Sequence, residues 1–308
     1  MKHTDIIQKL NLEQKCALLS GETVFTTRAL PGKGIPAITL SDGPNGVRKQ
    51  AGAADHLGLN PSVPATCFPT SSATACSWDE KLGEAVGEAL GEEAAAQEVA
   101  VLLGPGLNIQ RSPLCGRDFE YFSEDPLLTG KMACAQLRGM HRWGVTGTIK
   151  HFATNNQEHR RHFVESVVSE RALREIYLTG FEIAVKEGHP RSIMSSYNFV
   201  NGTYANENKH LLMEILRGEW GFDGAVITDW GGSNDHALGV KNGSTLEMPA
   251  PGGDAVRELL AAVESGKISE SDIDARLSEL LPLVFDTKAA LDAAPREFDA
   301  AAHHALAR

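Results

Sequence analysis

Short apolar runs alternate with longer amphipathic segments along most of this chain. The runs are rich in β-branched residues and end at glycine, proline or a polar residue, a pattern typical of strands buried in a parallel sheet. We expect strands at residues 38–40, 99–103, 145–149, 193–196 and 226–228. The alternation of such runs with amphipathic segments predicts a parallel sheet wound with helices.

The amphipathic segments carry helix start signals. These are a capping box at Ser77 and Glu80, a cap with an N1 proline at Asp125 and Pro126, and a serine cap at Ser169. The helix after Ser169 has apolar residues at helical spacing and should end near Gly188 and Pro190. Two further helices are expected over residues 254–266 and 269–281.

The regular alternation from about Ile38 to Leu281 favours one domain over two. We therefore predict an α/β fold, a (β/α) barrel of the TIM type that is irregular or incomplete, over residues 1–285. From residue 286 the composition becomes alanine-rich and no further strand is expected. Residues 286–308 are interpreted as a linker or a docking helix.

Charge and hydropathy exclude several classes of partner. The 308 residues carry a net charge of −11 without a basic stripe, which argues against a nucleic-acid partner. Residues 1–19 form an amphipathic pattern with internal lysines, neither a signal peptide nor a membrane span. We expect no membrane partner and a cytoplasmic location.

The cysteines and histidines give no metal-binding pattern. Five cysteines, with no Cys-x-x-Cys pair, are expected to be reduced core residues. His151, His159 and His162 lie close in sequence, but no two of them have the His-x-x-x-His spacing on one helix face, and no cysteine or carboxylate pattern completes a ligand set. We expect no metal and no cofactor.

Charged and aromatic side chains follow the expected strands. Asp229 comes directly after the strand at 226–228. The other strand ends lead into Asp42, Arg117, Lys150, His151 and Tyr197. Because ligands bind at the carboxyl ends of parallel strands, these residues predict one polar site at that rim. The structural alternative for Asp229 is a carboxylate that caps the following helix.

Five segments together resemble glycoside hydrolase family 3, in its β-glucosidase branch. They are LSDGPNGVR at 40–48, GRDFEYFSEDP at 116–126, KHF at 150–152, VSERALREIY at 168–177 and TDW at 228–230. Their order and spacing also match, and the resemblance runs from about Leu12 to Leu281. It implies a barrel that belongs to a retaining exo-glycosidase, which removes single sugars from non-reducing ends.

The resemblance implies a role for each matched residue. Asp229 would be the nucleophile that forms a covalent glycosyl-enzyme. Substrate contacts would come from Asp42, Arg117, Lys150, His151, Tyr197 and Trp230. Glu158, Arg161 and Met194 would support them. The structural alternatives are an ion pair for Arg117 and Lys150 and core packing for Trp230 and Met194, and Glu120 is expected to be structural.

Retaining hydrolysis also needs a second carboxyl group about 5 to 5.5 Å from the nucleophile. In this branch of the family an α/β sandwich domain after the barrel donates that glutamate, and residues 286–308 resemble the segment that leads into it. The expected partners are β-glucosides or oligosaccharides, with a second domain or a homo-oligomer partner completing the site. The alternatives are a catalytically incomplete sugar-binding barrel, a β-xylosidase, and an aldolase-like or metal-dependent barrel that uses Lys150 or the histidines.

Overall fold

The computed structural model describes residues 2–52, 54–55 and 59–308 and is built around a parallel sheet. The sheet has the order β1-β2-β3-β5-β8, with every neighbouring pair parallel. Its strands are β1 (Leu40–Asp42), β2 (Val101–Leu103), β3 (Thr146–Phe152), β5 (Ser192–Ser195) and β8 (Ala225–Ile227). All of them lie at or close to the positions that the apolar runs predict.

Single bridges extend this sheet toward a closed barrel. They are the parallel bridges Ile227 to Leu246 and Ser20 to Glu247, and the antiparallel bridges Gly21 to Thr27 and Thr26 to Thr39. The last of them returns the sheet to the segment that leads into β1. The fold is therefore a TIM-type barrel, as predicted, and its irregular part is where residues 19–27 and 245–247 contribute bridges in place of full strands.

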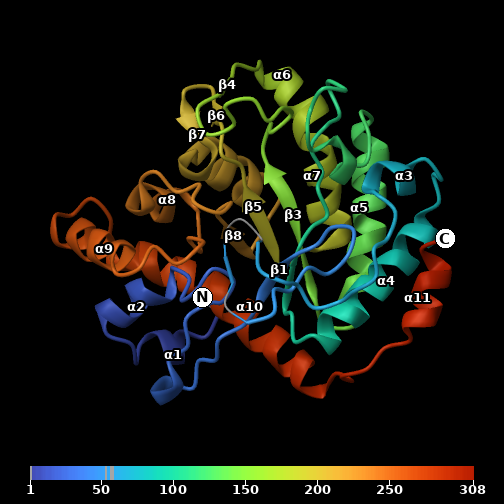
Figure 1. Ribbon diagram of the computed structural model, residues 1–308. Coiled ribbons are helices and arrows are strands. Elements are labelled where there is room, and N and C mark those ends of the chain that lie inside the picture. The colour runs from blue at the N-terminus through green and yellow to red at the C-terminus, as the bar shows by residue number, and fades with distance from the viewer. Residues whose placement is uncertain (1, 53, 56–58) are drawn as a thin grey trace.

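Helices α4 (Glu80–Ala96) and α5 (Pro126–His141) pack on one side of the sheet (Figure 1). Two glycines allow their close approach: a Cβ on Gly87 would lie 2.2 Å from the carbonyl oxygen of Gln136, and one on Gly139 would lie 2.2 Å from that of Glu84. The predicted cap at Asp125 is confirmed, since its carboxylate accepts the backbone N–H groups of Leu127 and Leu128.

The capping box predicted at Ser77 and Glu80 is wrong. Asp79 caps α4 by accepting the N–H groups of Lys81 and Leu82. The Ser77 hydroxyl instead donates to the carbonyl of Thr74 at 2.7 Å and accepts from the N–H of Asp79 at 3.1 Å. Ser77 therefore serves the turn that follows α3 (Ser71–Ala75).

The helical segment after Ser169 is confirmed. Ser169 accepts the N–H of Ala172, and the segment changes between α- and π-helical turns until Gly188, where His189 adopts a left-handed conformation. Its parts are α6 (Glu170–Ala172), η3 (Leu173–Leu178), α7 (Thr179–Ile183) and η4 (Ala184–Gly188).

The C-terminal part differs from the expectation. Helix α10 (Glu270–Ala293) continues through Pro282, so the boundary placed after residue 285 lies inside a helix. The reason is packing, because Thr287 and Leu291 are buried against the body of the barrel. Helix α11 (Ala300–Leu306) then docks on α4, where the two ring nitrogens of His303 lie 3.1 Å and 2.7 Å from carboxylate oxygens of Glu92 and Glu93.

The remaining elements complete the outer layer and the loops. They are α1 (Thr4–Ile7), α2 (Leu12–Leu18), η1 (Pro31–Lys33), η2 (Asp118–Glu120), η5 (Ala205–Glu207), η6 (His210–Glu219), α8 (His236–Asn242) and α9 (Asp254–Glu264). A small second sheet of β4 (Glu165–Ser166), β6 (Phe199–Val200) and β7 (Thr203–Tyr204) lies beyond the carboxyl end of β3 (Figure 1).

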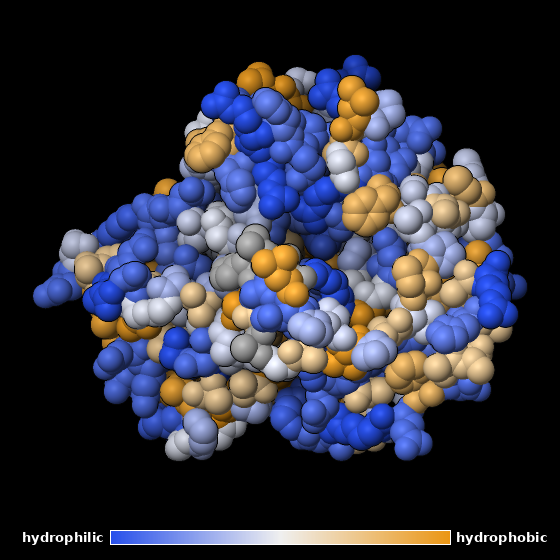
Figure 2. All heavy atoms as spheres, viewed as in Figure 1, coloured by the Kyte–Doolittle hydropathy of each residue, from blue (hydrophilic) through white to orange (hydrophobic). Residues whose placement is uncertain are grey.

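Hydrophilic residues cover most of the face seen in Figure 2, and the apolar ones form small separate patches. All five cysteines are free. Cys16, Cys115 and Cys134 are buried as expected, but Cys67 and Cys76 are exposed, so the expectation of core cysteines is wrong for these two. In the described part of the chain, no helix has both the length and the apolar character needed to cross a membrane.

Candidate active site

The barrel brings most of the predicted site residues together at the carboxyl ends of its strands. Lys150 and His151 lie near the carboxyl end of β3, and this strand extends further than the sequence predicts. Tyr197 follows β5 and Asp229 follows β8, each by two residues. Arg117 lies in the long loop after β2, immediately before η2. These five residues form one cluster around Asp229.

Asp229 is a buried carboxylate with one free oxygen. Its Oδ1 accepts the backbone N–H of Trp230 at 2.7 Å, whereas Oδ2 is buried and has no hydrogen-bond partner among the described residues. Burial raises the pKa of Asp229, and the positive charges of Arg117 and Lys150 oppose that rise. Asp229 does not cap the next helix: Asp235 does so, by accepting the N–H of Leu238.

A tight turn fixes the direction of Asp229. The N–H of Gly232 donates to the carbonyl of Asp229 at 2.8 Å, and the N–H of Gly231 donates to that of Met248 at 2.9 Å. Gly231 has a φ of +78°, which favours glycine. A Cβ at Gly232 would lie 3.2 Å from the ring of Tyr197. The two glycines that end this strand therefore allow the turn and its contact with Tyr197.

Glu120 is the counter-charge of the site. It is buried, and it forms ion pairs with Arg117 and with Lys150, whose Nζ lies 3.4 Å from Oε2. Burial would raise the pKa of Glu120, but these two cations hold it below its ordinary value. The ion pair that is the structural alternative for Arg117 and Lys150 is thus present in a largely buried form, and both cations also act on Asp229.

His151 is held as a neutral ring. Its backbone N–H donates to the side chain of Asn108 at 2.7 Å, and its Nδ1 lies 3.1 Å from the hydroxyl of Tyr121. Burial, together with the charges of Arg117 and Lys150, places the pKa of His151 well below its ordinary value. Its Nε2 faces Oδ2 of Asp229 at 3.7 Å.

Tyr197 is buried, and two side chains of the loop after β3 lie against its ring. The Arg161 guanidinium lies 4.8 Å from its ring centre, and the His162 ring is 4.1 Å away. Its hydroxyl donates to the carbonyl of Trp230 at 2.8 Å. Arg161 in turn pairs with Glu158 at 3.0 Å, so two of the three residues predicted as supporting do contact the cluster.

The side chains of the other three predicted residues have their contacts elsewhere. Trp230 is partly buried against Phe25, with a ring separation of 5.4 Å, and its Nε1 donates to the carbonyl of Val24 at 2.7 Å. Met194 is buried inside β5, where core packing describes it fully. Asp42 is the last residue of β1, and its side chain is 43% exposed and open to a ligand. Its Oδ2 lies 3.9 Å from a guanidinium nitrogen of Arg48.

Sequence reasoning missed several members of the cluster. Asn108 accepts the backbone N–H of His151. Asn155 donates to the Tyr121 hydroxyl at 3.3 Å and to Glu158 at 3.1 Å. The segment at 116–126 already contained Tyr121, but no residue-level signal marked the two asparagines. In residues 2–52, 54–55 and 59–308, no three His, Cys, Asp or Glu side chains group as metal ligands would.

The loop that carries Asp229 has a second anchor at its far end. Oε1 of Glu207, a buried residue of η5, accepts the N–H groups of Asn234 at 2.9 Å and Asp235 at 3.0 Å. Its backbone carbonyl accepts the side chain of Asn242 at 2.8 Å. Glu207 thus ties the start of α8 to the loop after β7.

A buried carboxylate flanked by an arginine, a lysine and a neutral histidine at the carboxyl ends of barrel strands defines a (β/α)-barrel protein with a polar ligand site. The family model of the glycosyl hydrolase family 3 N terminal domain matches residues 53–283, and the chain belongs to this family.

Curated relatives and solved structures agree with the family. The chain is 48% identical over 305 residues to a thermostable β-glucosidase B of Acetivibrio thermocellus, covering 98% of this chain and 40% of the relative. It is 43% identical over 302 residues to an exo-α-(1→6)-L-arabinopyranosidase of Bifidobacterium longum, with 98% and 40% covered. β-Glucosidase 3B of Thermotoga neapolitana, solved with α-D-glucose, superposes with a TM-score of 0.92 at 38% identity, covering 100% of this chain and 46% of that one. The chain spans about 40% of the length of these curated relatives.

Proposed function

We propose that this chain carries the nucleophile of a retaining exo-β-glycosidase of the β-glucosidase type. The observation that supports the proposal best is the free, buried Oδ2 of Asp229 at the mouth of the barrel. The positive charges of Arg117 and Lys150 favour the ionised form of the Asp229 carboxylate despite its burial. His151 is neutral and therefore forms no ion pair with it. A desolvated carboxylate without a hydrogen bond on one oxygen is a suitable nucleophile.

In the first step Oδ2 of Asp229 attacks the anomeric carbon as the bond from that carbon to the leaving oxygen breaks. The leaving oxygen takes a proton from a carboxylic acid. In the second step the resulting carboxylate removes a proton from water, the water oxygen bonds to the anomeric carbon, and the Asp229 carboxylate is released. Asp42, Arg117 and Lys150 would bind the sugar hydroxyls through charge-assisted hydrogen bonds.

We further propose that the acid/base carboxyl comes from polypeptide other than the described barrel residues. The acids that surround Asp229 are committed elsewhere: Glu120 pairs with Arg117 and Lys150, and Glu158 pairs with Arg161. A carboxylate that two cations stabilise is a poor proton donor at neutral pH. The second domain of the β-glucosidase branch is the expected source.

The preferred sugar is proposed to be β-D-glucose, because two of the relatives above are named as β-glucosidases and one was solved with glucose. The arabinopyranosidase relative shows that a barrel with 43% identity serves another pyranose. A β-xylosidase and a sugar-binding barrel without catalysis are the alternatives, and a panel of aryl glycosides separates them.

Labelling tests the nucleophile. A dinitrophenyl 2-deoxy-2-fluoro-β-D-glucoside has a leaving group that needs no protonation, so it should add one fluoroglucosyl group to the chain. Peptide mapping should place that group on Asp229, and Asp229→Asn should remain unlabelled. Labelling at Glu120 or Glu158 would contradict the assignment.

Leaving-group dependence tests the source of the acid. The chain alone should hydrolyse cellobiose about 10² to 10⁴ times more slowly than a form that contains the acid, because a sugar alkoxide needs protonation. Activated aryl glucosides should still glycosylate Asp229, and the adduct should persist in intact-protein mass spectra. Rapid cellobiose hydrolysis by the chain alone would place the acid within the barrel.

A further inference from the structure

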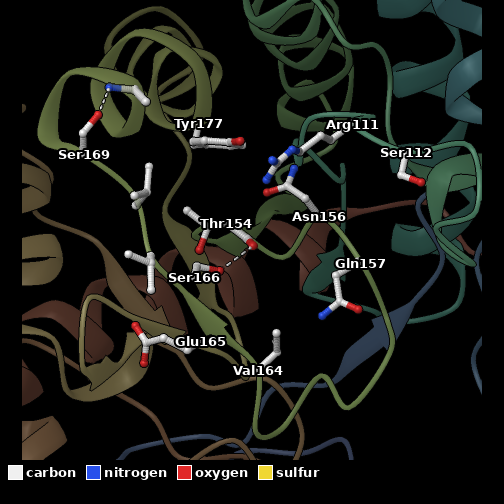
Figure 3. A pocket seen from close by; sticks show the side chains of 13 residues that line it. Arg111, Ser112, Thr154, Asn156, Gln157, Val164, Glu165, Ser166, Ser169 and Tyr177 are labelled. Carbon is white, nitrogen blue, oxygen red and sulfur yellow. Dashed lines mark hydrogen bonds between the residues drawn. The ribbon is translucent and has the colours of Figure 1, made fainter.

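A cavity lies beside the loop that supports the Asp229 cluster. It has a volume of about 670 Å³, and residues 154–169 form much of its wall (Figure 3). None of the predicted site residues lines it. Glu158 and Arg161, in the same loop, contact the Asp229 cluster instead. One loop therefore separates two sites.

One end of this cavity presents unpaired polar groups. The Arg111 guanidinium and the Tyr177 hydroxyl point toward one another in Figure 3, and neither has a partner among the described residues. Asn156 lies beneath them, with its Nδ2 donating to the carbonyl of Ile109 at 2.6 Å. This bond fixes the orientation of the Asn156 amide, and its oxygen accepts no hydrogen bond in the described part of the chain.

The rest of the cavity combines an apolar wall with further polar groups. Val164, Val167 and Val168 form that wall, and the side chain of Val167 is 87% exposed. At the end away from Arg111, Oε1 of Glu165 accepts the N–H of Gly202 at 2.8 Å, and its second oxygen stays free of described donors. Nε2 of Gln157, which also lines the cavity, is buried without a partner.

These groups select the chemistry of a ligand. One positive and one negative side chain at opposite ends favour a ligand without net charge. The Tyr177 ring and the valines fit the C–H faces of a pyranose, while amide, hydroxyl and guanidinium groups fit its hydroxyls. The volume lies within the range of about 300 to 1,000 Å³ that small-molecule sites occupy.

We propose that this cavity is a second saccharide-binding site, which takes a neutral oligosaccharide beside the catalytic site. The choice of a saccharide rests on the proposed function, because the substrate of that function is the ligand that this surface would meet. A bound sugar would contact Thr154 and Asn156, on either side of Asn155, whose side chain donates to Tyr121 and Glu158. The two sites are thus mechanically connected.

Titration after covalent blocking of the first site tests this proposal. The chain is labelled at Asp229 with the fluoroglucoside and then titrated with cellotriose, while backbone amide NMR signals are followed. We expect saturable binding at one site, with shifts at Arg111, Gln157 and residues 164–168. Arg111→Ala and Tyr177→Ala should each weaken this binding about tenfold, as expected for the loss of about 1.4 kcal/mol of contacts.

Two controls separate the outcomes. Arg171→Ala removes an exposed arginine that pairs with Glu175 one turn further along the same helical segment, and it should leave the affinity unchanged. Tyr177→Phe keeps the ring if Tyr177→Ala does not fold, and it should give a smaller loss. If labelling fails, the proposed function fails, but the same NMR shifts on the unlabelled chain still report on the cavity. Absence of those shifts at saturating cellotriose, or equal affinity of all variants, would overturn the second site.

Discussion

Nε2 of His151 lies 3.7 Å from Oδ2 of Asp229, which is beyond hydrogen-bond distance. The Tyr121 hydroxyl and Oδ1 of Asn108 lie 3.1 Å and 3.3 Å from Nδ1 on the other side of the imidazole, so the ring cannot move freely toward the carboxylate. The result is an ionisable oxygen that is buried, close to a polar ring, and not hydrogen-bonded to it. This separation leaves Oδ2 of Asp229 free of the ring, with the Nε2 atom of His151 beside it.

The first prediction concerns the pH dependence of labelling at Asp229. Because burial raises the pKa of Asp229, the labelling rate should fall on the acid side at a pH above 3.8, the ordinary value for this group. Lys150→Gln removes a charge that lowers this pKa, so the acid limb of the profile should move to higher pH. The measurement is the maximal labelling rate at each pH. An acid limb that does not move in the variant would show that Lys150 does not act on Asp229.

The second prediction concerns the counter-charge. Glu120→Gln leaves Arg117 and Lys150 without their buried partner, and it should destabilise the fold by about 3 to 5 kcal/mol. Glu182→Gln breaks an exposed pair with Lys186 and should cost less than about 1 kcal/mol. Urea unfolding of the three proteins at pH 7 gives both values. Similar losses in the two variants would remove the special role of Glu120.

The third prediction concerns sugar binding by Asp42. Asp42→Ala should weaken the binding of glucose or an iminosugar by about 2 kcal/mol, because a charge-assisted hydrogen bond is lost and its partner is left unpaired. Asp42 is partly exposed at the end of β1, so the unfolding midpoint should change little. Calorimetric titration provides the comparison. Equal affinities would mean that Asp42 only shapes the turn after β1.

The strands and the main site residues could be predicted because each has a local signal. β-Branched runs marked the strands, and charged or aromatic residues at or beyond the ends of those runs marked the polar cluster. Asn108 and Asn155 could not be predicted, because their partners lie 43 and 34 residues away in sequence and only the closed barrel brings them together. The end of α10 was missed for a similar reason. Leu291 is buried by contacts with the rest of the barrel, and the sequence around it has no helical periodicity strong enough to predict a helix that continues past Pro282.

The fourth prediction concerns Glu207 and the loop that carries Asp229. Glu207→Ala leaves the N–H groups of Asn234 and Asp235 without their acceptor, so the loop from Asp229 to α8 should loosen. We expect slower labelling of Asp229, about tenfold or more, with little change in the concentration that gives half-maximal rate. Glu207→Gln keeps an acceptor oxygen and should restore most of the rate.

A matched control uses a carboxylate with the same type of contact elsewhere. Asp299→Ala removes an acceptor for two backbone N–H groups, those of Ala301 and Ala302, at the start of α11. It should lower stability without slowing the labelling of Asp229. If both alanine variants slow labelling equally, the effect comes from general destabilisation and not from the loop.

The last prediction concerns Glu247, which follows the bridge between residues 227 and 246. Burial raises the pKa of Glu247 to about 7, with the charge of Glu258 adding to the rise and the nearby polar side chain of Ser233 opposing it. Between pH 4.5 and 7 the folded chain therefore keeps a proton that the unfolded chain releases. Stability should fall as the pH rises through this window, by roughly 3 kcal/mol at most.

Glu247→Gln imitates the protonated acid and should remove this dependence. The variant should be as stable as the parent near pH 4.5 and more stable at pH 8, when urea unfolding is compared across that range. His236, whose Nδ1 lies 3.7 Å from Oε2 of Glu247, stays neutral throughout because burial lowers its pKa to about 4. Glu264→Gln, at the exposed end of α9, should keep the slope of the parent. A Glu247→Gln variant with that same slope would show that Glu247 ionises normally in the folded chain.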